Sequence, residues 1–137
     1  MEPWKLHAVL HFIIPVILFV LSLLYIQELS LMERFIAIFI GAFLPDIDHL
    51  IYLKYIKFRS FKEFLVFNIK SDRERRGFLI FHNIYFIIIL LILVPIIMFF
   101  NLFLSLLLLA FLIHLIFDFF EDRIILNTSV HWRKIRK

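Results

Sequence analysis

Four apolar stretches, each long enough to cross the hydrocarbon core of a bilayer, constrain the fold of this chain more than any other feature. A helix rises about 1.5 Å per residue, so about 20 apolar residues span about 30 Å of hydrocarbon. Hydrophobic residues make up 64% of the 137 residues, against roughly 45–50% in a soluble domain. We therefore predict an all-α, polytopic membrane protein, a single integral membrane domain over residues 1–137 with transmembrane helices over about 8–26, 34–53, 78–100 and 102–120.

The connections between these stretches predict how the helices are arranged. The first and second stretches are joined by residues 27–33, and the third and fourth by a short connection around Asn101. Because these connections are short, each pair is expected to form an antiparallel hairpin of a four-helix bundle. The longer connection interleaves aromatic and basic residues over about 55–72, which predicts an amphipathic helix at the membrane interface. This helix is either an anchor alone or a lid over a site.

Lysine and arginine predict the orientation of the bundle. Most of them lie in residues 54–76 or in the tail after the fourth stretch, whereas Arg34 is the only one at or next to the two short connections. Basic residues accumulate in the cytoplasmic loops of membrane proteins. We therefore predict that the middle segment and both termini lie on the cytoplasmic side of the inner (cytoplasmic) cell membrane.

Hydrophilic side chains inside the predicted spans are the candidate functional residues. A charged residue at the centre of a spanning helix costs about 2.5–3.5 kcal/mol, so such residues normally face the bundle interior and mark function. Because the helices alternate in direction, all of these groups are expected to meet at the cytoplasmic end. The chain has no cysteine, so any metal there would be held by imidazole and carboxylate. The candidate metal ligands are His7, His11, Asp46, Asp48, His49, His82, His114 and Asp118.

Spacing along the helices supports this interpretation. His114 and Asp118 are four residues apart and share one helix face, like the ligand pairs that helix bundles project onto metals. His7 and His11 have the same spacing. Asp48 lies off the common face of its neighbours on an ideal helix, and we predict that it bridges two ions or orients water. Asp48 and Asp118 are the candidate catalytic residues.

Cations are predicted because carboxylates and imidazoles crowded into a partly desolvated site would otherwise repel one another or lose their charge. The candidate ligands outnumber those of a single tetrahedral ion, so we predict two or more divalent ions, with zinc favoured and manganese, iron or magnesium as alternatives. A proton or ion pathway is the competing explanation for polar groups inside a membrane. The remaining histidine, His131, is expected in an interfacial tail.

Three segments carry recognisable motifs: Leu-Pro-Asp-Ile-Asp-His at 44–49, Arg-Gly-Phe at 76–78 with the later His82, and the pair His114-x-x-x-Asp118. Together they resemble the YdjM-like membrane-bound metal-dependent hydrolases over most of the chain. The family's amino-terminal histidine corresponds to either His7 or His11. The order of the motifs is also similar to that of the zinc phospholipase C and P1 nuclease superfamily, a similarity that implies phosphoester hydrolysis at a site with several metal ions.

The resemblance and the position of the ligands imply a membrane-embedded metal-dependent hydrolase. Its expected substrate is a phosphoester in a lipid or lipid-linked molecule, cut by metal-activated water at the cytoplasmic face, so membrane lipid is the expected partner and nucleic acid is not. The candidate substrate-binding residues are Arg73, Arg76 and Asn83, although topogenic charge explains the arginines equally well.

Two alternatives stay open: a metal or proton transporter, and a non-catalytic membrane scaffold with a structural metal. A transporter needs polar groups across the whole membrane. The outer halves of the predicted spans offer few such groups beyond Ser22 and Tyr25, which argues against it.

Overall fold

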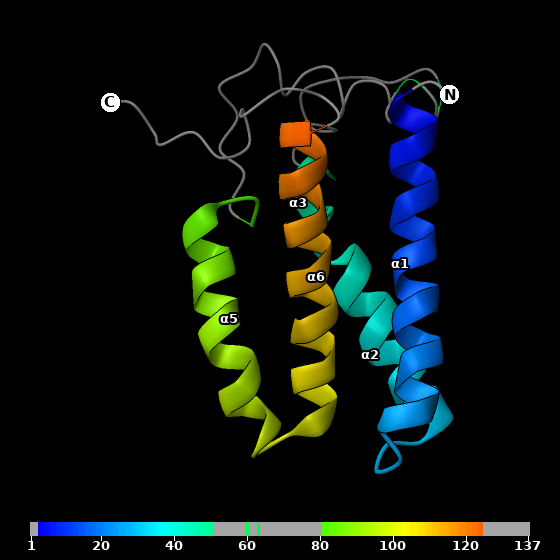
Figure 1. The fold of residues 1–137 in the computed structure, drawn as a ribbon, viewed down its shortest axis with the longest axis vertical. Coiled ribbons are helices and arrows are strands. Elements are labelled where there is room, and N and C mark those ends of the chain that lie inside the picture. Colours follow the sequence, from blue (N-terminus) through cyan, green and yellow to red (C-terminus); the bar gives the residue numbers. More distant parts are fainter. Residues whose placement is uncertain (1–2, 51–59, 61–62, 64–80, 125–137) are drawn as a thin grey trace.

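The computed structural model describes residues 3–50, 60, 63 and 81–124. Within these ranges the chain forms helices and no strand, which confirms the all-α prediction. Figure 1 shows that successive long helices alternate in direction. The elements are α1 (Pro3–Tyr25), α2 (Leu31–Phe43), the single-turn α3 (Ile47–Leu50), α5 (Ile84–Met98) and α6 (Leu102–Ile124).

The second predicted span, 34–53, is interrupted, because α2 ends at Phe43. Pro45 has no N–H and cannot bond the carbonyl oxygen four residues earlier, so the helical ladder stops there. The amides of the next three residues each bond a carbonyl oxygen three residues back, at 3.2 Å, and the tightened turn leads into α3. This turn carries the Asp-Ile-Asp part of the first motif.

The third predicted span, 78–100, begins later than expected. Asn83 ends the non-helical segment 81–83, and its side-chain oxygen accepts a hydrogen bond from the N–H of Tyr85, 3.0 Å away. Asparagine is a strong helix N-cap, so α5 starts at Ile84. Most of the predicted amphipathic segment, 55–72, lies outside the described residues.

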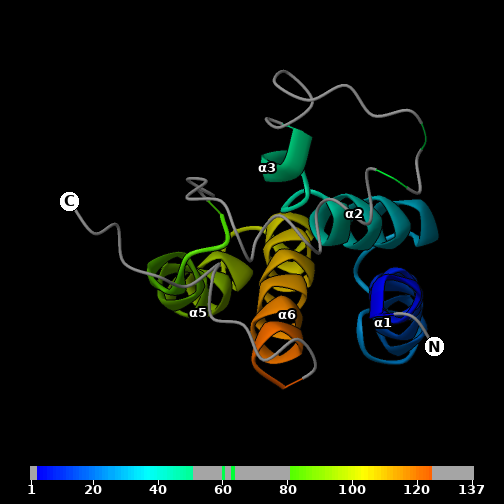
Figure 2. The same ribbon diagram turned by 90° about the horizontal axis from the view of Figure 1, so that it is seen from above.

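Helix α6 is the central element of the bundle. It packs against α1, α2 and α5, and Figure 2 shows it lying between α5 and the pair α1 and α2. The approach of α2 is close: a Cβ atom at Gly41 would collide with the carbonyl oxygen of Leu107, and Ala37 and Ala110 are fully buried nearby. Small residues allow this approach, and in a membrane such packing is a main source of helix association.

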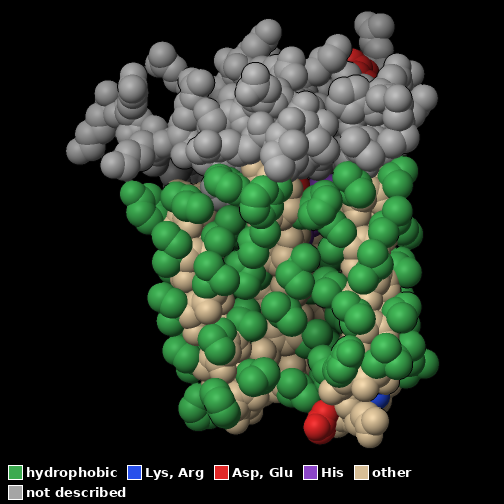
Figure 3. All heavy atoms as spheres, in the orientation of Figure 1, with side chains coloured by type: hydrophobic (Ala, Val, Ile, Leu, Met, Phe, Trp, Pro, Cys, Tyr) green, Lys and Arg blue, Asp and Glu red, His purple; other side chains and the backbone are tan. Residues whose placement is uncertain are grey.

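The outer faces of the bundle are apolar. Figure 3 shows hydrophobic side chains covering the helices along their length. Phe12 on α1 and Leu24 near its end are 63% and 65% exposed, and Tyr85 on α5 is 56% exposed. Soluble monomers rarely expose apolar patches of more than a few hundred Å², so a surface like this one suits lipid.

Length and hydropathy single out one helix that could cross a membrane among the described residues. It is the Leu102–Phe120 part of α6, with a mean hydropathy of 2.5. The Val9–Tyr25 part of α1 and the Ile84–Met98 helix are apolar but shorter, and α2 has only 13 residues. The structure therefore identifies one candidate span where the sequence predicted four.

Candidate metal centre

A single carboxylate, Asp118 of α6, lies at the middle of the polar cluster. Its Oδ1 atom is 2.9 Å from His11 Nε2 of α1. Its Oδ2 atom is 3.0 Å from His82 Nε2 and 3.1 Å from His114 Nε2. The four side chains come from α1, from the segment before α5 and from two successive turns of α6, so the fold brings together residues that are far apart in the sequence.

The cluster is shielded from solvent. The exposed fractions of His82, His114, Asp118 and His11 are 1%, 4%, 7% and 9%. Charged or strongly polar groups buried to this extent need partners or a bound ion, because burial removes the water that would otherwise solvate them. Because these buried side chains come from three parts of the chain, the fold assembles them into one site.

Asp46 lies at the edge of the same cluster. Its Oδ1 atom is 3.6 Å from His114 Nε2, and its side chain is 38% exposed. The rings of His11 and His114 meet edge to face beside it, with their centroids 4.4 Å apart. Asp46 is therefore the carboxylate of the cluster that faces solvent most.

Two overlapping groups of side chains have the geometry to hold a cation. His11, Asp46 and His114 form one, and His82, His114 and Asp118 form the other; within each, the ligand atoms lie within 4.8 Å of one another. His114 belongs to both. Imidazole nitrogens and carboxylate oxygens at these separations are a donor set that suits a divalent cation such as zinc.

The close approaches are not all hydrogen bonds. His114 Nε2 and Asp118 Oδ1 have no hydrogen-bond partner among the described residues, although each has an oppositely polar atom about 3 Å away. Buried polar atoms are normally satisfied, and each exception calls for an explanation such as an ion. A cation between these atoms would satisfy them, so the residues present fit a divalent metal.

Asp48 occupies a different position. It is 2% exposed, and its Oδ2 atom accepts a hydrogen bond from the backbone N–H of Phe81 at 2.6 Å. The same atom is 3.6 Å from His82 Nδ1, the ring nitrogen that does not face Asp118. Asp46 and Asp48 therefore point to different partners, as their spacing on a helix predicts. Sequence reasoning missed the Phe81 amide, because a backbone N–H carries no sequence signal.

The other predicted site residues are placed only in part. Asn83 caps α5 with its side-chain oxygen, a role that its position before an apolar run indicates. His7 lies in α1 and His49 in α3, but their side chains are outside the described part of the structure. Arg73 and Arg76 also lie outside the described residues. The structure thus brings together His11, Asp46, His82, His114 and Asp118, with Asp48 behind His82.

Comparison with known proteins adds the family. Neither the curated proteins nor the solved structures contain a match to this chain. One family model, described as YdjM inner membrane protein, matches residues 6–125, a range that includes every residue of the cluster. The resemblance predicted from the sequence motifs is confirmed, and the chain belongs to the YdjM inner membrane protein family.

Proposed function

We propose that this protein is a membrane-embedded metal-dependent hydrolase that cuts a phosphoester in a lipid or lipid-linked substrate. The observation that carries the proposal is the convergence of three imidazole nitrogens on the Asp118 carboxylate at 2.9–3.1 Å, inside an apolar helix bundle. A divalent cation bound there would lower the pKa of a bound water molecule toward about 7, which would supply a nucleophile at neutral pH.

The proposal includes four membrane crossings with both termini in the cytoplasm. The apolar outer faces and the basic residues at 54–76 and in the tail support it. Helices α2 and α5 have 13 and 15 residues, which is short for a full crossing. Their missing length lies beside the centre, at 44–46 and 81–83. Non-helical backbone at membrane depth is tolerated where it is buried in protein, and the buried Pro45 and His82 in these two segments are consistent with that condition.

Within this scheme the side chains divide the work. His11, His82, His114 and Asp118 would hold the cation. Asp46 is the more exposed carboxylate and lies beside His114, so it suits the role of a base that takes a proton from the attacking water. This assignment replaces Asp48 as the proposed base, since Asp48 is engaged with the Phe81 amide.

The ligand shared by the two candidate groups bears on how many ions we propose. Both candidate groups use His114, so the described side chains form one connected centre rather than two separate ones. The second ion that the sequence predicts would draw on further ligands, for which His7 and His49 are the candidates. Zinc stays the favoured ion, because its preferred ligands include the nitrogen and oxygen donors present here.

A transporter is a weaker proposal than a hydrolase. In the half of the bundle away from the centre, the buried hydroxyl of Ser22 bonds the carbonyl oxygen of Phe19, and that of Ser105 bonds the carbonyl oxygen of Val94. These groups are satisfied by nearby backbone and do not extend toward Asp118, so the described residues supply no polar relay across the bundle. A purely structural metal is disfavoured by the solvent-facing Asp46.

The test is metal analysis and an activity assay on protein purified in detergent. We expect stoichiometric divalent metal in the wild type, loss of most of it in His114→Ala, and wild-type content in His131→Ala, a histidine control from the tail. With metal bound, phosphate release from a short-chain phosphatidic acid in mixed micelles should depend on His114. A wild type that is metal-free after incubation with zinc, manganese and iron would overturn the proposal. Metal without turnover of lipid or soluble phosphoesters would support the scaffold instead.

A further inference from the structure

Asp48 is a buried carboxylate that belongs to neither candidate ligand group. Its exposed fraction is 2%, the smallest of the acidic side chains in the cluster, and it lies on the far side of His82 from Asp118. A carboxylate is costly to bury without partners, so its contacts should reveal what it does.

The two polar contacts that Asp48 makes with described residues are with consecutive residues of the segment that precedes α5. Its Oδ2 atom accepts a 2.6 Å hydrogen bond from the Phe81 N–H and lies 3.6 Å from His82 Nδ1. The first contact is a strong charge-assisted hydrogen bond, and the second is an ion-pair distance longer than a hydrogen bond. One oxygen of α3 thus fixes the backbone at Phe81 and faces the ring of His82.

The two nitrogens of His82 face carboxylates on opposite sides. Nε2 is 3.0 Å from Asp118 Oδ2, and Nδ1 is on the Asp48 side. An imidazole that binds a metal through Nε2 keeps its proton on Nδ1. A carboxylate beside that proton fixes the tautomer and the ring orientation, and it makes Nε2 a stronger metal ligand. Asp48 is placed to do this for His82.

We infer that Asp48 is a positioning residue for the metal centre. It holds the Phe81 backbone by a hydrogen bond and polarises the His82 ring from the Nδ1 side, so that His82 Nε2 is oriented toward the cation. The inference rests on the proposed metal centre and assigns Asp48 a role as neither ligand nor base. It also explains why the turn at Pro45 matters, since that turn directs Asp46 toward His114 and Asp48 toward His82.

The test compares Asp48→Asn with Asp48→Ala and with Glu33→Gln, a carboxylate control from the opposite end of the bundle. Asparagine keeps an oxygen that can accept the Phe81 N–H bond but removes the negative charge beside His82. Zinc affinity is measured by competition with a chelating dye, and the geometry of the centre is read from the visible absorption of the Co²⁺-loaded protein. Thermal melts of the metal-free variants report whether the fold survives.

We expect Asp48→Asn to bind zinc about 10–100-fold more weakly, the range for loss of a group that orients a metal-bound histidine. Its metal-free melting temperature and Co²⁺ band positions should stay close to the wild type, whereas Asp48→Ala should also melt at a lower temperature. Glu33→Gln should leave affinity unchanged.

Three results would overturn the inference. Wild-type affinity in Asp48→Asn would mean that the carboxylate only holds the backbone. A shift of the Co²⁺ bands would mean that Asp48 binds the metal directly. A wild-type protein that binds neither Zn²⁺ nor Co²⁺ would remove the metal centre itself, and with it both the proposed function and this role.

Discussion

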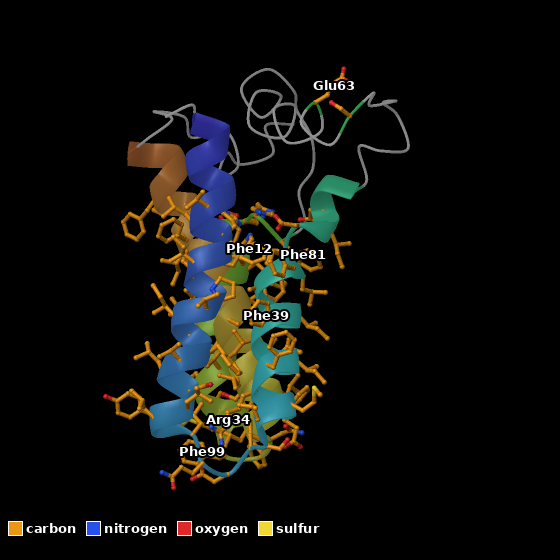
Figure 4. The ribbon with its side chains drawn as sticks, turned by 90° about the vertical axis from the view of Figure 1, so that its right-hand side faces the viewer. Phe12, Arg34, Phe39, Glu63, Phe81 and Phe99 are labelled. Carbon is orange, nitrogen blue, oxygen red and sulfur yellow. The ribbon has the colours of Figure 1, made fainter. Side chains whose placement is uncertain are left out.

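The two ends of the bundle both contain polar groups but use them differently. At one end, His11, His82, His114 and Asp118 face one another across helices. At the other, Arg34 donates from Nε to the carbonyl oxygen of Leu29 at 2.7 Å, and its position at the α1–α2 connection is visible in Figure 4, far from Phe81. The second end satisfies its polar groups from its own backbone.

This difference separates an arrangement that joins distant segments from one that is made of local contacts. Ser30 and Glu33 form a reciprocal capping box at the start of α2, in which every partner is a few residues away in the sequence. Such local bonds hold a helix end and need no ligand. The polar cluster around Asp118 instead joins distant segments and leaves buried atoms without hydrogen-bond geometry, which an ion would satisfy.

The largest effect should follow from removing the charge at the middle of the cluster. We expect Asp118→Asn, which keeps the shape of the side chain, to weaken divalent metal binding by more than about 100-fold, because the Asp118 carboxylate contacts three imidazoles. Loss of a group that only orients a metal-bound histidine costs about 10–100-fold, and loss of a direct ligand should cost more. Isothermal titration with Zn²⁺ measures this. Equal Zn²⁺ affinity in the variant and the wild type would contradict the assignment of the metal centre to this end of the bundle.

A second change attacks the packing on which the centre depends. Gly41→Ala should destabilise the bundle by about 1–3 kcal/mol, the usual cost of overpacking, because the new methyl group would collide with the Leu107 carbonyl. Ile40→Ala, at a position 50% exposed on the same helix, is the control and should cost less. Unfolding in detergent at increasing denaturant concentration gives the free energies of unfolding of both variants. A Gly41→Ala protein as stable as Ile40→Ala would contradict the close α2–α6 approach.

The smallest effect is expected at the end without the cluster. Ser105→Ala removes the 3.0 Å bond to the Val94 carbonyl, and interhelical hydrogen bonds of this kind in membrane proteins contribute about 0.6 kcal/mol on average. Thermal melts should detect a small loss of stability, while metal content stays at the wild-type level. Loss of metal from Ser105→Ala would show that the two ends are coupled.

Much of the arrangement could be predicted from the sequence, for a physical reason. Helices joined by short connections must alternate in direction, so residues at the start of one apolar stretch and at the end of the next lie at the same end. That reasoning places His11 near His114 and Asp118. The i, i+4 spacing of His114 and Asp118 predicts their shared face, and their closest atoms are 3.1 Å apart.

The ends of the helices beside the centre could not be predicted as well. Residues 44–53 contain Pro45, Asp46 and Asp48, so an irregularity at Pro45 could be predicted, but hydropathy does not give the residue at which α2 ends. Nor does it indicate that His82 lies before the start of α5. These boundaries depend on Pro45, on the Asn83 cap and on the bond from Phe81 to Asp48. The last of these joins residues 33 apart in the sequence and is set by tertiary packing.

The central place of α6 has a consequence for how the protein is made. A chain emerges from the ribosome with its amino terminus first, and α6 is the last of the described helices to appear. Until it arrives, α1, α2 and α5 lack the neighbour that all of them contact, and His11 and His82 lack Asp118. In the proposed metal centre, loading of the ion would therefore wait until α6 has packed against α1, α2 and α5.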